Sequence, residues 1–187
     1  MGTQDCTIVA IDGDFNSKTL VTLGTDHWPY AISIRKSKMY VLVSGGPSTP
    51  CTINVYDLSG QLISQWDRKD KCHYVRPAIV SNQIVIPDTQ HKQLTVYSLS
   101  GEVIKQIPYP QFTGSNWDGS TICTAGSNFV IVLTMNPSQV SKVNITTGEK
   151  VWTCNDVVKP QTAAIFGSNY VCVGSKGKIS FLNINTG

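Results

Sequence analysis

Hydrophobic and polar residues alternate with a period of two along most of this chain, and no segment shows a sustained period of 3.6. Such alternation indicates half-buried β-strands, because successive side chains of a strand point to opposite faces of a sheet. Stretches such as YAISIRKSKMYVLVS and PAIVSNQIVIPD each hold two alternating runs around a short polar turn, which is typical of antiparallel neighbours. The pattern therefore predicts an all-β protein with almost no helix.

One motif repeats along the chain: an alternating run that ends in a glycine turn. The turn glycines are Gly13, Gly60, Gly101, Gly148 and Gly187, and they lie 47, 41, 47 and 39 residues apart. A spacing of about 40 to 50 residues is that of β-propeller blades. Each complete interval holds four strand signals, and the chain holds 17. We therefore expect a β-propeller of four-stranded antiparallel blades, with about four blades' worth of strands.

The strand signals describe one propeller region, residues 1–187, with an incomplete blade at each end. We predict a partial blade at 1–24, full blades at 25–67, 68–108 and 109–156, and a partial blade at 157–187. Two strands fall in the first partial blade and three in the last, so they do not close a ring neatly. An open arc would leave sheet edges free to pair. We therefore expect part of a larger propeller, the alternative being an irregular closure.

Residues 86–107, IPDTQHKQLTVYSLSGEVIKQI, resemble the NHL repeat. That repeat reads apolar-x-Asp-x-x-Asn-His-x-apolar-x-apolar-aromatic, followed by glycine. His91 stands where the repeat has Asn, and Lys92 where it has His. The matching residues are Ile86, Asp88, Leu94, Val96, Tyr97 and Gly101.

The resemblance implies a propeller of the six-bladed type and a function as a recruiting module. NHL propellers often bring protein substrates or RNA to tripartite-motif ubiquitin ligases, although the zinc-binding Cys/His patterns of the ligase are absent from this sequence. It also implies that the turn residues have a structural role, with Asp88 and His91 tying their loop to a neighbouring strand. The structural blade motif is then Asp88, His91, Gly60, Gly101 and Gly148.

Two other propeller repeats fit the sequence less well. WD40 blades open with a Gly-His pair, which this chain lacks. The segment TTGEKVWTC is similar to a quinone-binding propeller repeat, since Trp152 follows Gly148 by four residues. The other blades have no tryptophan at that offset, so we keep the NHL resemblance.

Composition and cysteine spacing place few further demands on the chain. Charged residues make up 14% of it and the formal net charge is +3, which does not indicate a nucleic-acid or membrane binder by itself. Residues 1–13 lack the basic and apolar regions of a signal peptide. No two of the six cysteines lie within four residues, so we expect free buried thiols and a cytoplasmic protein without membrane contact.

Catalytic chemistry has weak support in the sequence. His27, His73 and His91 have no partner at metal-ligand spacing, and no nucleophile elbow, Walker loop or dinucleotide fingerprint occurs. We therefore expect no enzyme activity, no catalytic residue, no metal and no cofactor. The alternative is a propeller enzyme with a metal held by the three histidines at the channel mouth.

Candidate binding residues gather on one predicted face. With the strands of a blade labelled a to d in chain order, the d–a and b–c loops emerge on the same side. These loops carry cations and aromatic rings, among them Lys92, Lys159, Lys176 and Lys178. We expect this face to bind a protein or peptide, since rings and arginines dominate such interfaces. The predicted partner-binding residues are Trp28, Tyr30, Arg68, Lys69, Lys71, Tyr74, Arg76, Phe112 and Trp117.

Two alternatives apply to this loop face. Cations interleaved with rings also suit single-stranded RNA, because cations contact its phosphates and flat rings stack on its bases. The rings before strand a can instead fill the space between blades and bind nothing. The sequence alone does not choose among partner binding, RNA binding and packing.

Overall fold

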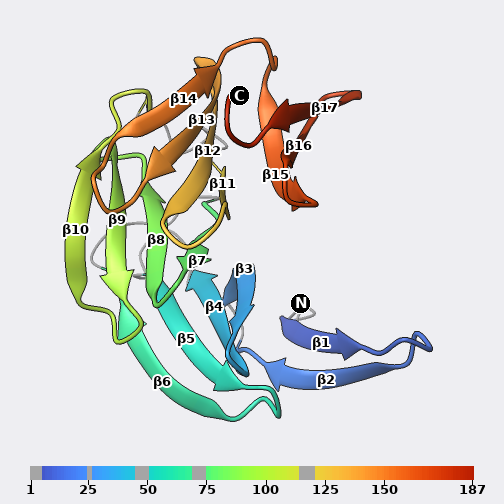
Figure 1. The fold of residues 1–187 in the computed structure, drawn as a ribbon. Helices are drawn as coiled ribbons and strands as arrows, with labels where there is room; N and C mark the ends of the chain where they lie inside the picture. Colours follow the sequence, from blue (N-terminus) through green and yellow to red (C-terminus); the bar gives the residue numbers. More distant parts are fainter. Residues whose placement is uncertain (1–5, 25–26, 45–50, 69–74, 114–120) are drawn as a thin grey trace, which may run out of the picture. The chain divides into compact units, whose positions relative to one another are not determined.

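The structure, a computed structural model, describes residues 6–24, 27–44, 51–68, 75–113 and 121–187 (Figure 1). In these ranges the chain forms 17 strands and no helix, which confirms the all-β prediction. No helix of the described ranges is long and apolar enough to cross a bilayer. By its internal contacts the chain divides into two compact units, residues 1–72 and 73–187.

The first unit contains a two-stranded sheet and a four-stranded sheet, each antiparallel with neighbouring strands consecutive in the chain. Its core lies between them, where Ile8 and Leu23 meet Met39, Val41 and Val43. The strands are β1 Thr7–Ile11 and β2 Ser17–Thr22 in one sheet, and β3 Trp28–Arg35, β4 Lys38–Ser44, β5 Thr52–Asp57 and β6 Leu62–Asp67 in the other.

The second unit contains two four-stranded antiparallel sheets and one of three strands. Their first strands, β7, β11 and β15, contact one another in turn, so the sheets stack as successive blades with strand a innermost. The strands are β7 Ala78–Val80, β8 Gln83–Asp88, β9 Gln93–Ser98 and β10 Val103–Pro108; β11 Thr121–Thr124, β12 Phe129–Met135, β13 Ser138–Asn144 and β14 Lys150–Cys154; and β15 Pro160–Phe166, β16 Tyr170–Ser175 and β17 Lys178–Asn183.

Strand β12 shows why the middle strands of a blade are apolar on both faces. Val130 and Val132 pack into the core against the preceding sheet, while Ile131 and Leu133 pack against the following one. All four side chains are fully buried. A strand covered on both sides loses the polar half of its alternation, as the run FVIVLTM does. Strands that are buried between two blades therefore have short continuous apolar runs in the sequence.

The β1–β2 turn and the turns that follow the third strand of each later sheet share one hydrogen-bonding scheme. Asp57 Oδ1 accepts the backbone N–H groups of Ser59 at 2.8 Å and Gln61 at 2.9 Å. A short polar side chain that bonds the backbone just ahead of it stabilises a turn. The residues that accept in this way are Asp12, Asp57, Ser98, Asn144 and Asn183.

The repeat glycines owe their place to backbone conformation. Gly60, Gly101 and Gly148 have φ values of 94°, 91° and 86°, which only glycine adopts at little cost. The first turn corrects the prediction: Gly13 is not its left-handed residue, since Phe15 takes that conformation with φ 64°. Phe15 follows Asp12 by three residues, as Gly60 follows Asp57. The repeat spacing is therefore 45 residues here rather than 47.

Some of these glycines also lie close to the preceding sheet. A methyl group on Gly60 would collide with the carbonyl of Leu20 in β2. One on Gly148 would stand 3.4 Å from Ile107 in β10, and one on Gly187 would stand 3.1 Å from Trp152 in β14. Each turn thus rests on the last strand of the blade before it.

The last sheet leaves one face uncovered. Ile179 and Phe181 in β17 are 66% and 57% exposed, and Phe166 of β15 packs edge-on against Phe181 with ring centroids 5.6 Å apart. By strand pairing they correspond to Val140 and Lys142 of the sheet before, which the last sheet buries. The exposed face is therefore of the kind that a further blade covers elsewhere in this unit.

The cysteines partly contradict the expectation of free thiols. Cys51 is disulfide-bonded, so the prediction is wrong for this residue. Cys6, Cys123, Cys154 and Cys172 are free. Cys72 lies outside the described residues. Spacing along the chain carried no signal for the bond, because a disulfide requires Cα atoms within about 7 Å, a distance that the fold sets rather than the sequence separation.

Candidate functional site

A hollow of about 360 Å³ opens on the side of the second unit from which its d–a and b–c loops emerge. One wall is the d–a loop between β14 and β15, and the other is the b–c turn between β16 and β17 together with the start of β17. Both loops belong to the face on which partner binding was predicted. The lining residues are Asp156, Val157, Val158, Lys159, Ser175, Lys176, Lys178 and Ser180.

The d–a wall is held in place by the sheet behind it. Val157 is buried in the core that β12 and β16 share. The backbone N–H of Lys159 donates to Ser138 Oγ at 2.9 Å, and Lys159 has a left-handed φ of 47°. A lysine adopts this conformation only when its surroundings compensate for the cost. The loop is thus anchored on both sides of the exposed Val158.

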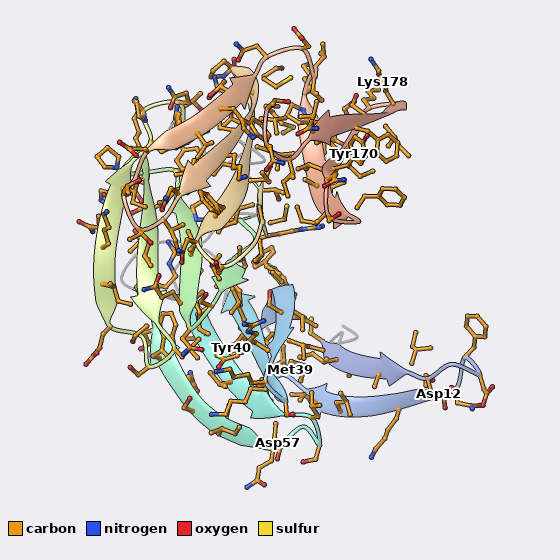
Figure 2. All side chains as sticks on the ribbon, in the orientation of Figure 1. Asp12, Met39, Tyr40, Asp57, Tyr170 and Lys178 are labelled. Atoms are coloured by element: carbon orange, nitrogen blue, oxygen red, sulfur yellow. The ribbon has the colours of Figure 1, made fainter. Side chains whose placement is uncertain are left out.

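The opposite wall is a tight hairpin turn. Ser175 and Lys178 are paired across β16 and β17, so only Lys176 and Gly177 form the connection, and Gly177 has a φ of 73°. Lys178 and Ser180 lie on the side of β17 opposite Ile179 and Phe181, because side chains alternate along a strand. Figure 2 shows Lys178 extending from the start of β17.

The hollow is cationic. Three lysines, Lys159, Lys176 and Lys178, are exposed in its lining and are opposed by one carboxylate, Asp156. At neutral pH this leaves two positive charges in excess. Two hydroxyl groups and two valines complete the lining, which has no aromatic side chain. Such a surface attracts an anionic group that carries an apolar stem.

The structure separates the predicted partner-binding residues into several environments. Trp28 in β3 is 47% exposed, Tyr30 is half-buried and Arg76 is exposed. Arg68 is only 2% exposed and so does not offer its side chain to a partner, which corrects its assignment. The remaining predictions Lys69, Lys71, Tyr74 and Trp117 lie outside the described residues, as does His73.

Phe112 also needs correction, because it is fully buried. Its ring packs on Tyr109 with centroids 4.7 Å apart, in the core between the first two sheets of the second unit. Burial raises the pKa of the Tyr109 hydroxyl to about 12. Lys150 Nζ lies 4.3 Å from the centre of the Tyr109 ring. These rings fill the space between blades, the packing alternative that the sequence left open.

Asp88 and His91 lie together at the β8–β9 turn. Asp88 is 3% exposed, and its carboxylate accepts the backbone N–H of His91 at 3.0 Å and the Gln93 amide at 3.1 Å. His91 Nδ1 lies 2.8 Å from Asp88 Oδ2, the oxygen that also accepts from the Gln93 amide, and the imidazole ring is largely exposed. The buried carboxylate therefore joins the turn to strand β9 of its own blade.

Neither a metal-binding cluster nor a reactive thiol at Cys123 is present in the described part of the chain. No group of three or more His, Cys, Asp and Glu side chains lies close enough there to hold a metal. Burial raises the pKa of the Cys123 thiol to about 12, which leaves almost no thiolate at neutral pH.

Sequence reasoning pointed to the three lysines of the hollow but not to its other residues. Asp156 and Val158 lie in the same loop as Lys159, and Ser175 and Ser180 flank the β16–β17 turn. Serine and valine side chains carry neither a positive charge nor an aromatic ring, so the pattern of cations and rings did not include them. The signal that could have found them is the shared position of these loops at one end of the sheets.

Comparison with known proteins supports the fold. No family model matches the chain, and no curated protein sequence matches it. BamB from Moraxella catarrhalis is similar with a TM-score of 0.60 and 18% identity over 85% of this chain and 47% of that one. The WD40 domain of Pan2 from Neurospora crassa has a TM-score of 0.65 and 12% identity over 91% and 50%.

Virginiamycin B lyase from Staphylococcus aureus is similar with a TM-score of 0.65 and 13% identity over 97% of this chain and 64% of the lyase. The chain has a β-propeller fold. At these identities the likeness concerns the fold alone, because one fold hosts many functions. The chain spans about half to two thirds of the lengths of these propellers.

Proposed function

We propose that this propeller chain is a non-catalytic interaction module that binds a protein or peptide partner through its d–a and b–c loops. The observation that carries the proposal is the hollow between the β14–β15 loop and the β16–β17 turn. Its volume lies within the range of about 300 to 1,000 Å³ typical of ligand sites. Its anchored loops also lower the entropy that a partner must offset on binding.

The NHL resemblance suggests a narrower form of this function. In that form the chain would be the substrate-recruiting part of a tripartite-motif-like ubiquitin ligase. The turn of Asp88 and His91 supports it, since the carboxylate bonds its own turn and strand as a structural blade motif would. No family model supports the assignment.

Two other functions have less support. Single-stranded RNA needs flat rings beside cations, whereas the hollow has no aromatic lining and Phe112 is buried. A propeller enzyme is represented among the similar structures by a lyase. The described residues hold no cluster of three or more metal ligands, and burial raises the pKa of the Cys123 thiol, which disfavours its use as a nucleophile.

A cytoplasmic location stays a proposal, and the disulfide at Cys51 argues against it. Disulfides persist mainly in oxidising compartments and are rare in the cytosol. Cell fractionation followed by alkylation of free thiols in the native protein would decide between the two environments. A reduced Cys51 in the cytosolic fraction is the outcome that favours the cytoplasm.

The proposed function can be tested with an apolar photo-crosslinking residue at Val158, which is exposed in the lining, so that all three lysines stay in place. We expect a discrete protein adduct in cell extract that forms at Val158 and not at Ser168, which lies exposed in the β15–β16 turn at the opposite end of the same sheet. Mass spectrometry identifies the adduct. Equal labelling at both positions, or nucleic acid as the adduct, would contradict the proposal.

A further inference from the structure

The lysine-lined hollow has the charge and the hydrogen-bond donors of a recognition site for phosphate. We propose that it binds a phosphorylated side chain of a peptide partner. This inference rests on the proposed function, because the phosphate belongs to the partner that the loop face binds. It adds the chemical class of the group that is recognised.

The charge of the lining fits a phosphomonoester. Lys159, Lys176 and Lys178 against Asp156 leave two positive charges in excess. A phosphorylated side chain carries about −1.5 to −2 at pH 7, which balances that excess. A single carboxylate would leave about one positive charge uncompensated, so glutamate or aspartate is the poorer match.

The donors of the hollow also fit phosphate. Each lysine ammonium offers three donors, and Ser175 and Ser180 each add a hydroxyl group. Ser175 Oγ donates to the Lys178 carbonyl at a long 3.4 Å, so little is lost when it turns to a ligand. Hydrogen bonds between ammonium groups and phosphate oxygens are of the stronger, charge-assisted kind.

The apolar part of the lining favours a peptide over a nucleic acid. Val158, which is 69% exposed, offers an apolar surface against which the carbon stem of a phosphorylated side chain can lie. A nucleotide base would need an aromatic or guanidinium plane for stacking. The lining offers neither, so bases would gain little there.

The test uses isothermal titration with acetylated, amidated pentapeptides that differ only in the central residue: phosphoserine, serine or glutamate. We expect binding of the phosphoserine peptide, and at least about tenfold weaker binding by Lys176→Gln and Lys178→Gln, because each removes one charge-assisted contact. Lys18→Gln, an equal loss of charge on exposed strand β2 of the other unit, is the control and should not change the affinity.

Several results would overturn the inference. These are equal affinity for the glutamate and phosphoserine peptides, phosphoserine binding that both lysine variants retain, or tighter binding of a poly-uridine oligonucleotide that the same variants weaken. The substituted lysines are exposed, and unchanged amide spectra of each variant would show that it folds.

The two proposals fail separately. A protein adduct at Val158 without phosphoserine binding contradicts only the phosphate inference. Lysine-dependent phosphoserine binding without any selective adduct in extract contradicts only the proposed partner function.

Discussion

Phe15 and Asp57 show how single residues support or strain the repeated turn of this propeller. Both occupy positions in the same hydrogen-bonded scheme, one at the left-handed position and one as the acceptor. Phe15 is 89% exposed and gains little from packing in return for its unfavourable φ of 64°. Asp57 is well suited to its position, since its carboxylate collects several donors.

Phe15→Gly is expected to stabilise the first unit. A non-glycine residue in the left-handed region costs roughly 1 to 2 kcal/mol, part of which the greater unfolded-chain entropy of glycine offsets. The net gain should be about 0.5 to 1 kcal/mol. Urea unfolding should show a higher midpoint with an unchanged m value. A lower midpoint would mean that the ring makes contacts that its exposure does not indicate.

Asp57 is expected to make the first unit sensitive to acid. The Ser59 hydroxyl and then the Gln61 N–H lower the pKa of the Asp57 carboxyl below its ordinary value of 3.8. Its stabilisation is therefore full above the unfolded pKa and is lost as pH falls through the lower folded pKa. Carboxyl NMR titration should show a depressed pKa that returns toward 3.8 in Ser59→Ala. Asn144 and Asn183 accept backbone N–H groups in the corresponding turns, so the Asp57→Asn variant should keep its turn. Because Asn does not titrate, this variant should lose less stability between pH 5 and pH 2 than the wild-type protein loses.

At the scale of elements, blade stacking depends on short contacts between a turn and the last strand of the sheet before it. The indole N–H of Trp152 in β14 donates to the Ile184 carbonyl at 3.0 Å. Lys105 Nζ in β10 donates to the Thr146 carbonyl at 2.6 Å. Lys105 follows Gly101, and Trp152 follows Gly148, by four residues. The offset that suggested a quinone-binding repeat is thus explained by a contact between blades.

Gly60→Ala is expected to weaken the docking of the β5–β6 turn on β2. The added methyl group meets the backbone carbonyl of Leu20 and also suffers from the φ of 94°. Gly126→Ala is the matched control, since Gly126 has a φ of 100° and no atom near its missing Cβ. Gly126→Ala should cost about 1 to 2 kcal/mol, and Gly60→Ala more, with faster amide exchange in β1 and β2. Equal costs would contradict the close approach.

At the scale of the whole chain, the sequence predicted the features that depend on hydrophobic periodicity and local turn residues. Alternation and turn residues predicted the strands, since both are local properties of the chain. Phe112 and Gly13 were misjudged because burial and φ depend on neighbours that strand pairing supplies. The hollow could be predicted only in part, since the lysines carry a visible charge whereas Ser175, Ser180 and Val158 become significant only when two loops meet.

The disulfide at Cys51 is expected to contribute to the stability of the chain. Alkylation of the unfolded, unreduced protein should modify four of the six cysteines, and modification of all six would contradict the bond. Reduction should lower the thermal midpoint, because removing a native disulfide typically costs about 2 to 5 kcal/mol. Cys6→Ser, which removes a free thiol of the same unit, is the control for the loss of a cysteine.

The contact between Trp152 and Ile184 has a consequence for measured affinities. One wall of the lysine-lined hollow belongs to the last sheet and the other to the loop before it, so a ligand selects molecules in which that sheet is docked. The apparent dissociation constant is then the intrinsic one divided by the docked fraction. Trp152 touches the end of the docked sheet, and its fluorescence can report that fraction in a variant whose other tryptophans, Trp28, Trp66 and Trp117, are replaced by Phe. The apparent dissociation constants of two preparations can then be corrected for their different docked fractions before they are compared.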